Sequence, residues 1–368
     1  MGTAKAYIAS IAAVAPAFSA DQQFVADLIR DRYSAMLTPR SQGLIRATFS
    51  HPSIRKRHFA LDDPLRVIDE SPDERIARFT EKSIELSGEA VASALDRAGL
   101  GVADVRGLVV NTCTGYICPG ISTYLLERLG LPRSTRVYDM VGSGCGGALP
   151  NLQVAESILG TTGGAVVSVA VEICSAVFQM DNSLSLIMSN AIFSDGAAAA
   201  VLWERPEGLE LVASASRYVP EKRDDIRFVH RQGQLHNQLS LNLPGVVKVA
   251  AAEAVGEVLS CRSLTPGDIR HWALHTGGEK IINAVRDEIG IPEERLRATR
   301  RILEEYGNMS SPTVWFVLDE LLREGVPPGD WCLMAAYGAG LSAHAYLLKK
   351  SPVTAGPSNR FLRTYAGI

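Results

Sequence analysis

Disulfide frameworks, zinc sites and membrane spans have no support in this sequence. Its six cysteines are too sparse in 368 residues for a disulfide framework. No cysteine pair has CxxC spacing, and no cysteines and histidines have the spacing of zinc ligands, so no metal is expected. No uncharged apolar run reaches the roughly 20 residues that span a bilayer. The run Tyr7–Ala17 contains Pro16, which favours an opening strand over a signal peptide. We therefore expect a soluble, cytoplasmic protein.

A strong charge of either sign is also missing. The chain has 37 Lys and Arg against 40 Asp and Glu, a net charge of −3. This balance excludes the basic footprint of a nucleic-acid-binding protein. Apolar residues make up 46% and charged residues 21%, close to globular averages, so a disordered or coiled-coil protein is excluded. The length suffices for two domains, or for one large domain with a substantial core.

What the sequence does contain is an alternation of helical and extended stretches. Apolar spacing predicts helices at residues 74–98, 148–159, 244–259, 278–289, 296–306 and 312–323. Short apolar runs predict strands at residues 107–113, 165–171, 197–203, 209–216, 271–274, 331–337 and 342–348, the third and fourth as a pair. This alternation predicts an α/β fold of mixed layers, built from two similar halves that divide between residues 205 and 206. The charged stretch 217–238 is expected to be an exposed excursion.

A cysteine surrounded by glycines stands directly before one predicted helix. In the string VGSGCGGAL, Cys145 follows Gly144 and precedes Gly146 and Gly147. Glycine permits a sharp turn and the close approach of a ligand. The positive end of a helix dipole lowers the pKa of a nearby thiol. Cys145 is therefore either a nucleophile with a lowered pKa or a buried cysteine in a tight turn.

A histidine stands at the end of a predicted strand. His275 follows the strand 271–274 in the string WALHTGG and is followed by two glycines. In open α/β sheets, ligands approach the strand ends, so His275 is a candidate site residue. His271 lacks the glycines, and we expect it to be structural.

An asparagine lies in the loop between two predicted helices. Asn308 belongs to the string EYGNMSSP, where Ser310 or Ser311 can cap the next helix. On its own, this loop is expected to be structural. Together, Cys145, His275 and Asn308 can act as nucleophile, base and amide donor. A fourth loop, YGAG with Gly338 and Gly340, can line the same cavity.

These motifs resemble those of the type III polyketide synthases, which form the chalcone and stilbene synthase family of the thiolase-like superfamily. The resemblance rests on GCGG at Cys145, FSDG at Phe193, HTGG at His275, YGNMSS at Asn308 and the late YGAG loop, in family order over most of the chain. It implies a five-layered αβαβα fold of two similar halves, assembled as a homodimer. Residues 1–205 would carry the cysteine, and residues 206–368 the histidine and asparagine.

The resemblance also implies chemical roles. Cys145 would hold an acyl-CoA starter as a thioester, while His275 and Asn308 would bind malonyl-CoA, promote loss of CO2 and stabilise the enolate. The enolate would then attack the acyl group on Cys145. No cofactor, metal or carrier protein is implied, because free CoA esters are the substrates. A thiolate–imidazolium pair of Cys145 and His275 is expected in the resting enzyme.

Further positions match residues around the family's cavity. Phe193 matches the phenylalanine between the CoA tunnel and the cavity, and Cys118 matches a methionine that reaches into the partner's cavity in plant enzymes. The other matched lining positions are Cys113, Cys174, Val177 and Ser310. The first three are less polar than the threonines of plant enzymes, so they either pack in the core or line a cavity for an apolar chain.

A basic cluster corresponds to the family's contacts with the CoA phosphates, although a solvated helix face would look the same. The cluster consists of Arg46, Arg55, Lys56 and Arg57, with His51 where a lysine is expected. Two residues depart from the family pattern: Ala339 replaces a proline, and His344 replaces a glutamate.

We predict a type III polyketide synthase that forms an alkylpyrone or alkylresorcinol from a fatty acyl starter and malonyl-CoA. The main alternative product is a small aromatic made from malonyl-CoA alone, such as a dihydroxyphenylacetyl thioester. A chain-initiating ketoacyl synthase of fatty-acid synthesis shares the Cys-His-Asn set, but would carry an asparagine soon after its histidine, where this chain has HTGG. A non-catalytic partner subunit tends to lose the cysteine, and a cysteine hydrolase would need a water-activating geometry.

Overall fold

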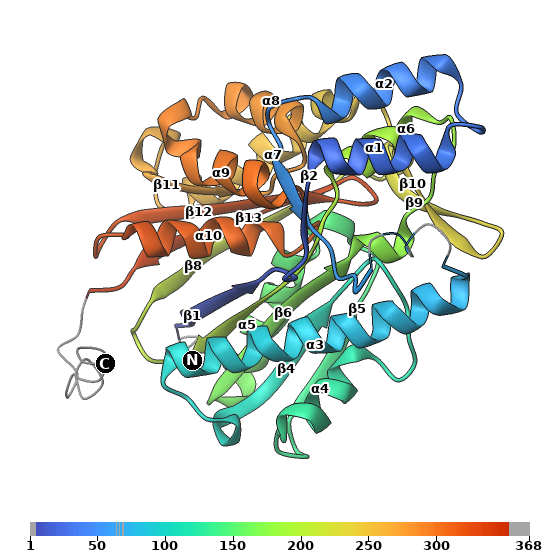
Figure 1. Cartoon of the computed structure of the whole chain (residues 1–368). Helices are drawn as coiled ribbons and strands as arrows, with labels where there is room; N and C mark the ends of the chain where they lie inside the picture. Colours follow the sequence, from blue (N-terminus) through green and yellow to red (C-terminus); the bar gives the residue numbers. More distant parts are fainter. Residues whose placement is uncertain (1–4, 64, 66, 68–69, 353–368) are drawn as a thin grey trace, which may run out of the picture.

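The computed structural model describes residues 5–63, 65, 67 and 70–352 (Figure 1). Within them, one large sheet has the strand order β11-β12-β13-β8-β1-β7-β6-β4-β5. Its strands are β1 (Tyr7–Val14), β4 (Val105–Asn111), β5 (Arg136–Met140), β6 (Ala165–Ile173), β7 (Asp195–Trp203), β8 (Leu209–Tyr218), β11 (His271–Leu274), β12 (Trp331–Gly338) and β13 (Ser342–Lys350). The strands before residue 206 therefore occupy one end of the sheet, and the strands after it occupy the other. The two groups meet where β1 pairs with β8.

Helices lie on both outer faces of this sheet and between its two ends. The helices α5 (Ala148–Thr162) and α10 (Thr313–Glu324) contact strands from both ends, so they form a middle layer. The helices α3 (Pro72–Ala98) and α4 (Ile121–Leu129) pack outside the β4–β7 end, whereas α7 (Leu243–Ser260), with α8 (Glu279–Ile289) beside it, packs outside β8, β12 and β13 (Figure 1). This is the five-layered αβαβα fold predicted from the sequence.

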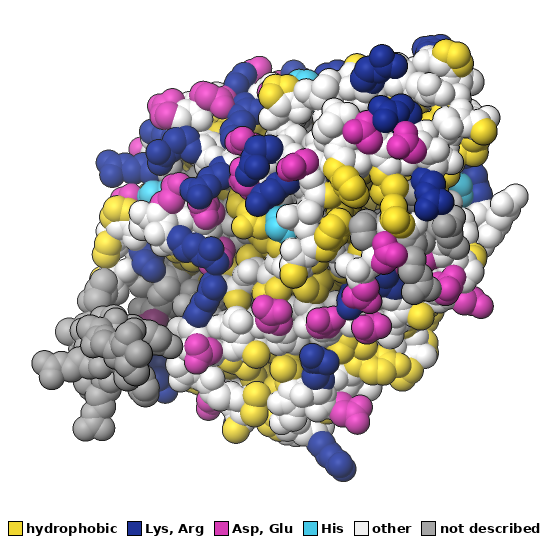
Figure 2. Space-filling view, in the orientation of Figure 1, with side chains coloured by type: hydrophobic (Ala, Val, Ile, Leu, Met, Phe, Trp, Pro, Cys, Tyr) yellow, Lys and Arg dark blue, Asp and Glu magenta, His cyan; other side chains and the backbone are white. Residues whose placement is uncertain are grey.

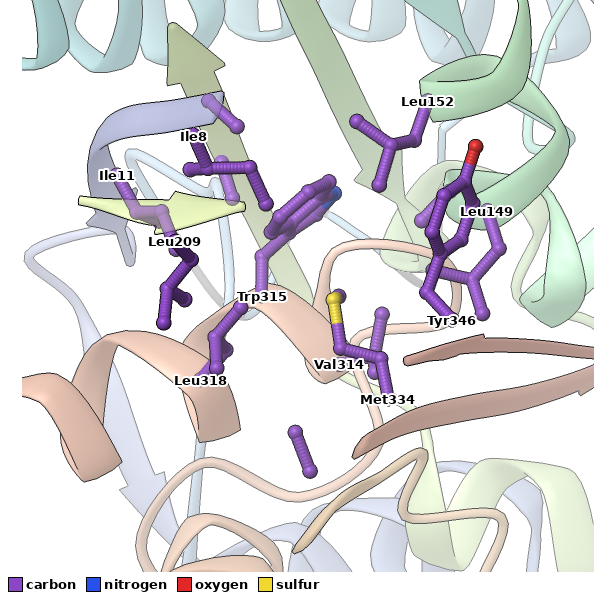
Figure 3. Close-up of a cluster of buried hydrophobic side chains, with 14 of the residues drawn as sticks. Ile8, Ile11, Leu149, Leu152, Leu209, Val314, Trp315, Leu318, Met334 and Tyr346 are labelled. Carbon is purple, nitrogen blue, oxygen red and sulfur yellow. The ribbon is translucent and has the colours of Figure 1, made fainter. Parts of the chain in front are cut away.

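The middle layer contains the largest hydrophobic cluster. Trp315 of α10 is fully buried and lies among apolar side chains from β1 and α5, including Ile8 and Leu152 (Figure 3). Replacing such a side chain with alanine costs about 3–5 kcal/mol. Packing between the two ends of the sheet therefore fixes where α5 and α10 begin, and both begin at the candidate site.

The long helix α3 begins and ends at strong local signals. Ser71 accepts a hydrogen bond from the backbone N–H of Glu74, whose carboxylate accepts one from Ser71 N. Pro72 occupies the first turn, and Gly99 ends the helix in the left-handed conformation with φ 65°. The sequence prediction of 74–98 was confirmed, apart from the two residues before Glu74.

The expected pairing of residues 197–203 with 209–216 is wrong. Both stretches form strands, β7 and β8, but β1 lies between them and is antiparallel to each. Their closeness in the sequence did not determine their pairing, because the N-terminal strand supplies a partner for both.

The stretch 217–238 is not simply an exposed excursion. Strand β8 continues to Tyr218, and a half-buried hairpin follows, formed by β9 (Ile226–Arg231) and β10 (Gln234–Leu239). The hairpin packs on α6 (Leu184–Ile192). The charged residues of the stretch lie mainly in 221–227, before β9 and at its start, so the average composition of the stretch concealed the two strands.

An N-terminal excursion covers the same end of the molecule as the hairpin. It consists of β2 (Ser19–Asp21), α1 (Gln22–Tyr33), α2 (Pro39–Phe49) and β3 (Lys56–His58). The helix α9 (Arg297–Tyr306) packs against β3. None of the helices in the described ranges combines the length and apolar character needed to cross a membrane.

Candidate active site

Three loops bring the sequence-predicted residues to one region. Cys145 lies in a 3₁₀ turn, Gly144–Gly146, before α5, His275 follows β11, and Asn308 lies between α9 and α10. Their exposed fractions are 7%, 2% and 2%. The hydroxyl of Ser310 donates to Cys145 Sγ at 3.3 Å, and the hydroxyl of Thr276 donates to the Gly307 carbonyl at 3.4 Å. The Asn308 loop is therefore connected to both of the others.

A cavity of about 50 Å³ opens beside Cys145. Of the predicted lining residues, it contains Cys113, Cys174, Val177, Phe193 and Ser310, together with Ala339 of the late loop. His275 and Asn308 lie outside its lining. Cys118 is exposed and also lies outside it.

The turn at Cys145 is glycine-rich because another backbone segment presses against it. A Cβ on Gly146 would lie 3.0 Å from Gly338 N, and one on Gly338 would lie 2.1 Å from the Ser143 carbonyl oxygen. Gly338 therefore supports the turn from behind and does not line the cavity. Gly340 supplies a positive φ of 77° to the hairpin turn that places Ala339 on the cavity wall.

The Cys145 thiol has a raised pKa, which contradicts the expectation of a lowered one. Burial raises its pKa to about 12 and outweighs the hydrogen bond from the Ser310 hydroxyl, which lowers it. Burial likewise lowers the pKa of His275 to about 3. Cys145 and His275 are therefore both neutral in the ligand-free site. They do not form the expected thiolate–imidazolium pair there. Desolvation of each group exceeds what the start of α5 supplies.

The side-chain amide of Asn308 has its oxygen in a hydrogen bond, whereas its nitrogen has none within the described residues. Its Oδ1 accepts from Ser310 N at 2.8 Å, and no described group bonds its Nδ2. Its backbone bonds Ile192 and Ser194, on either side of Phe193. The site therefore has an amide donor in a fixed orientation, with its N–H groups unengaged.

Neither serine caps α10 as expected. The helix begins at Thr313 without a side-chain cap. Ser310, in a left-handed conformation with φ 61°, donates to Cys145, and Ser311 donates to Glu172 Oε1 at 2.6 Å. Both hydroxyls serve the site instead of the helix end.

Glu172 is a site residue that sequence reasoning missed. It is fully buried at the end of β6, and Oε2 accepts from the backbone N–H groups of Cys113 and Thr114 at 2.9 and 3.1 Å. Together with Ser311, these bonds connect the Cys113 loop to the Asn308 loop. Burial raises its pKa. A lone glutamate in the apolar run AVVSVAVEI was the available signal, because a carboxylate is buried only where hydrogen bonds compensate it.

The cavity also has lining residues that were not predicted. They come from α6, from the segment before it, and from the hairpin: Phe178, Leu186, Ser189, Asn190, Ile226, Arg227, Phe228, Asn237 and Leu239, with Thr114. The hairpin was the decisive omission, because its strand pattern was not recognised.

The basic cluster does not form one phosphate-binding surface. Arg57 is 2% exposed and lies in the interior, so it cannot contact a phosphate at the surface. Arg55 forms an ion pair with Glu305 at 2.5 Å, and Lys56 Nζ lies 3.6 Å from the same carboxylate. Arg46 is exposed on α2. Arg46, Arg55 and the half-buried Lys56 are left as candidates to bind CoA, and Arg55 and Lys56 would first have to leave Glu305.

The remaining candidates have structural environments. His271 Nε2 bonds Asp330 at 3.0 Å, away from the cavity, as expected for a structural histidine. Cys261 is exposed and Cys332 is buried, and neither lines the cavity. No set of three or more His, Cys, Asp or Glu residues in the described ranges is arranged to hold a metal ion.

Comparisons with known proteins match most of the chain. Residues 210–352 match the family model "Chalcone and stilbene synthases, C-terminal domain", and residues 61–215 match "FAE1/Type III polyketide synthase-like protein". A 3,5-dihydroxyphenylacetyl-CoA synthase from Streptomyces toyocaensis is 32% identical over 321 residues, covering 83% of this chain and 82% of that protein. A 1,3,6,8-tetrahydroxynaphthalene synthase from Streptomyces peucetius subsp. caesius is 30% identical over 351 residues, covering 92% and 93%.

A solved structure, PKS-I from the brown alga Ectocarpus siliculosus, has the same fold. Its TM-score is 0.87 at 26% identity, and the match covers 95% of this chain and 99% of that one. The structure of 1,3,6,8-tetrahydroxynaphthalene synthase from Streptomyces coelicolor has a TM-score of 0.84 at 24% identity, covering 94% and 99%.

Proposed function

Because the chain belongs to the chalcone and stilbene synthase family of type III polyketide synthases, we propose that it condenses malonyl-CoA with an acyl-CoA starter held on Cys145. His275 and Asn308 are the other two catalytic residues of this proposal. The contact that supports it best is the hydrogen bond of 3.3 Å from Ser310 to Cys145 Sγ, which joins the nucleophile to the Asn308 turn.

The first step loads the starter. Neutral His275 takes the thiol proton, and Cys145 Sγ attacks the thioester carbon of the starter. The bond from that carbon to the CoA sulfur breaks, and CoA leaves as the thiol with the proton from His275. His275 is unprotonated in the ligand-free site because burial lowers its pKa, and the same burial weakens it as a base. The Ser310 hydroxyl stabilises the developing charge on Sγ.

The second step forms the enolate. The bond between the malonyl methylene carbon and its carboxyl carbon breaks, CO2 leaves, and negative charge develops on the thioester oxygen. The unengaged Nδ2 of Asn308 and the N–H of neutral His275 donate to that oxygen. Such preorganised donors are each worth about 10²–10³ in rate. A carboxylate at residue 308 would instead repel the enolate.

The third step makes the carbon–carbon bond. The enolate carbon attacks the thioester carbon on Cys145, the bond to Sγ breaks, and the extended chain remains on CoA. Sγ leaves as a thiolate, takes up a proton from water, and is ready for another cycle. Free CoA esters suffice as substrates, and the proposal needs neither a cofactor nor a carrier protein.

The product class follows from the starter. Cys113, Cys174 and Val177 make the cavity apolar and favour a fatty acyl starter, which gives an alkylpyrone or alkylresorcinol. A small aromatic made from malonyl-CoA alone is the second candidate, because the cavity measures only about 50 Å³ and Phe228 of the hairpin occupies one wall. Mass analysis of products from malonyl-CoA, with and without a series of acyl-CoA starters, distinguishes the two.

A homodimer is also part of the proposal. Strand β5 lies at one end of the sheet and leaves its outer edge unpaired within the described chain. Tyr138 on β5 is 48% exposed, and Tyr116, near the exposed Cys118, is 74% exposed. A second copy would cover these side chains. Sedimentation equilibrium measures the mass in solution, and a monomer contradicts this part.

The decisive experiment separates the nucleophile from the enolate donors. We expect Cys145→Ala to form no polyketide but to decarboxylate malonyl-CoA slowly, because His275 and Asn308 remain. Cys332→Ala, which removes a buried thiol outside the cavity, should retain product formation. Normal polyketide from Cys145→Ala would show that the nucleophile is assigned wrongly.

A further inference from the structure

One arginine of the basic cluster lies in the interior without an acidic partner. Figure 2 shows Lys and Arg side chains at the surface of one face of the molecule, many of them beside Asp or Glu. Arg57 of β3 is 2% exposed, and no carboxylate of the described residues forms an ion pair with it. Burial lowers its pKa to about 9, although the charge of Asp195 raises it. Arg57 therefore remains charged at neutral pH, at a cost in desolvation.

The guanidinium of Arg57 is held at a fixed place. Its Cζ lies over the rings of Phe49 and Phe59, 5.5 and 5.1 Å from their centroids. Its Nε donates to Gln22 Oε1 at 2.8 Å. Its Nη2 is buried without a hydrogen-bond partner among the described residues, and Arg57 borders a cavity of about 70 Å³ beneath α1. A buried N–H group without a partner lowers stability, so the reason to keep an arginine here has to lie in what its other donors bind.

The Nη1 donors are directed at the end of α6, whose last carbonyls have no partner within the helix. Arg57 Nη1 donates to the carbonyls of Asn190 and Phe193, both at 2.7 Å. Gln22 Nε2 donates to the carbonyl of Ala191, also at 2.7 Å. A positive charge is favourable at this negative end of the helix dipole. Arg57 and Gln22 together therefore fix the backbone at the end of α6.

The loop that carries Asn308 is attached to the same helix end. The N–H of Asn308 donates to the Ile192 carbonyl at 2.8 Å, and the Asn308 carbonyl accepts from Ser194 N at 2.9 Å. Gly307, with φ 71°, packs directly on the arginine: an added Cβ would lie 2.8 Å from Arg57 Cγ and 2.9 Å from the Ile192 carbonyl oxygen. Arg57 therefore contacts the residue before Asn308 and also holds the segment to which Asn308 is bonded.

We propose that Arg57 is a positioning residue for the decarboxylation of malonyl-CoA, which acts through the end of α6 and Gly307 to fix the side-chain amide of Asn308. This inference rests on the proposed function, in which Nδ2 of Asn308 donates to the enolate oxygen. Arg57 lies outside the lining of the cavity beside Cys145, so it acts through Asn308 and not on the substrate. Other segments fix the turn of Cys145, so the reactivity of its thiol should not depend on Arg57.

The first test removes the forked contact and keeps the positive charge. In Arg57→Lys, an ammonium group cannot bond Gln22 and both α6 carbonyls in the geometry of a guanidinium. We expect kcat for malonyl-CoA decarboxylation to fall about tenfold or more, because a small displacement of a catalytic group is costly, while KM stays unchanged. Alkylation of Cys145 by iodoacetamide, located by peptide mass analysis, should keep its rate. An unchanged kcat, or an equal fall in both rates, overturns the proposal.

The variant Arg75→Lys is the matched control. Arg75 is also buried, and its guanidinium donates to three carbonyls that lie outside α6 and outside the loop after α9. These carbonyls belong to Val67, Glu70 and Phe178. The control should lose a similar amount of stability in urea denaturation and keep kcat for decarboxylation. An equal fall of kcat in the two lysine variants would make Arg57 a general structural residue and contradict the proposal.

The second test asks whether Arg57 acts through Asn308. In Asn308→Ala the amide is gone, so adding Arg57→Lys should lower kcat for decarboxylation by no more than about twofold, because the two residues act as one unit. In the protein that retains Asn308, the same change should cost about tenfold or more. Effects that multiply independently in the double variant would overturn the proposal.

A further variant protects these tests against a folding defect. Gln22→Leu removes the bonds to Arg57 Nε and to the Ala191 carbonyl but leaves the guanidinium in place. If Arg57→Lys is insoluble, a fall of kcat with unchanged KM in Gln22→Leu supports the proposal, and an unchanged kcat overturns it. If the unmodified protein decarboxylates malonyl-CoA and Arg57→Lys does so equally fast, this inference fails and the proposed function stands. If the unmodified protein does not decarboxylate malonyl-CoA, the proposed function fails.

Discussion

The two helices of the middle layer, α5 and α10, each follow a sharp turn that carries a site residue, but the turns are built differently. The turn before α5 holds Cys145, with Gly144 at φ 55°, and backbone atoms fix it, such as Ala339 N bonding the Ser143 carbonyl at 3.1 Å. The turn before α10 holds Asn308, with Ser310 at φ 61°. Side chains fix this second turn.

This difference determines what each turn tolerates. Near Cys145 the space is closed by backbone, so an added side chain is excluded there. Near Asn308, a non-glycine residue with positive φ is retained because surrounding bonds oppose the strain. Those bonds are Asn308 Oδ1 with Ser310 N, Ser311 with Glu172, and the Thr313 hydroxyl with the Ser310 carbonyl. Deleting side chains should damage the second turn, and adding them should damage the first.

The largest effect is expected where a methyl group is forced into the glycine turn. In Gly338→Ala, the new Cβ would lie 2.1 Å from the Ser143 carbonyl oxygen and 2.6 Å from Gly146 N. Neither atom can move without displacing Cys145. We expect loss of polyketide formation, and a free energy of unfolding lower by about 3 kcal/mol in urea denaturation. Gly256→Ala in α7, whose Cβ meets nothing within 4 Å, is the control and should be neutral or stabilising. Full activity of Gly338→Ala would refute the close-packed turn.

In the other turn, the asparagine should matter for the reaction more than for the fold. Asn308→Ala removes the unengaged amide donor and also the acceptor for Ser310 N. We expect the rate of malonyl-CoA decarboxylation to fall about 10²–10³-fold, with a free energy of unfolding lower by about 1 kcal/mol. Isotope-labelled CO2 release measures the first quantity and urea denaturation the second. A loss of stability as large as that of Gly338→Ala, with decarboxylation retained, would make Asn308 a structural residue.

A smaller effect is expected from the hydroxyl that ties this turn to Glu172. Ser311 donates to Glu172 at 2.6 Å and accepts from Asn111 Nδ2 at 2.8 Å, so Ser311→Ala leaves two buried groups without a partner. We expect the free energy of unfolding to fall by about 2 kcal/mol. Ser87→Ala is the matched control, because the buried Ser87 hydroxyl has no hydrogen-bond partner among the described residues and its removal should be nearly neutral. Equal changes in the two variants would contradict the role of this network.

The turn at Cys145 was easier to recognise in the sequence than the turn at Asn308, because backbone contacts fix the first and side-chain contacts fix the second. The glycines around Cys145 are visible as letters, and they reflect a close backbone approach that leaves few other residues possible. The network of Glu172 joins residues that lie far apart in the sequence, and only the fold brings them together. The alternation of elements and the layers followed from apolar periodicity. The pairing of β1 with both β7 and β8, and the hairpin that lines the cavity, depended on tertiary contacts.

The pKa values show the same limit. A glycine turn before a helix predicted a lowered thiol pKa, because the helix start is a local feature that a sequence displays. The depth of burial that raises the pKa of Cys145 to about 12 depends on the whole fold. Burial acts in the same direction on His275, whose pKa is lowered to about 3. The meeting of the three loops could therefore be predicted from the sequence, whereas the direction of these pKa shifts could not.

The smallest expected effect concerns pH, because the two helices are anchored by titratable groups of opposite kind. Glu172 holds the α10 turn, whereas on the α5 side Gln153 Nε2 bonds the Ser216 hydroxyl, which bonds His344 Nδ1 at 2.8 Å. Burial lowers the pKa of His344 to about 4, below the value of about 6.5 in an unfolded chain. The unfolded state therefore binds the proton first, and stability falls as the pH drops from about 6.5 to about 4.

His344→Asn removes this titration and keeps a side chain that can bond Ser216. We expect the variant to lose less of its free energy of unfolding on acidification, by about 2 kcal/mol at about pH 5. Urea denaturation across this pH range measures the difference. The acid sensitivity that remains should come from His275, His58 and His236, whose pKa values are also lowered by burial. Glu172 acts in the opposite direction, because its raised pKa favours the folded state when the carboxyl is protonated. Parallel pH profiles for the variant and the unmodified protein would mean that His344 does not anchor α5 in its neutral form.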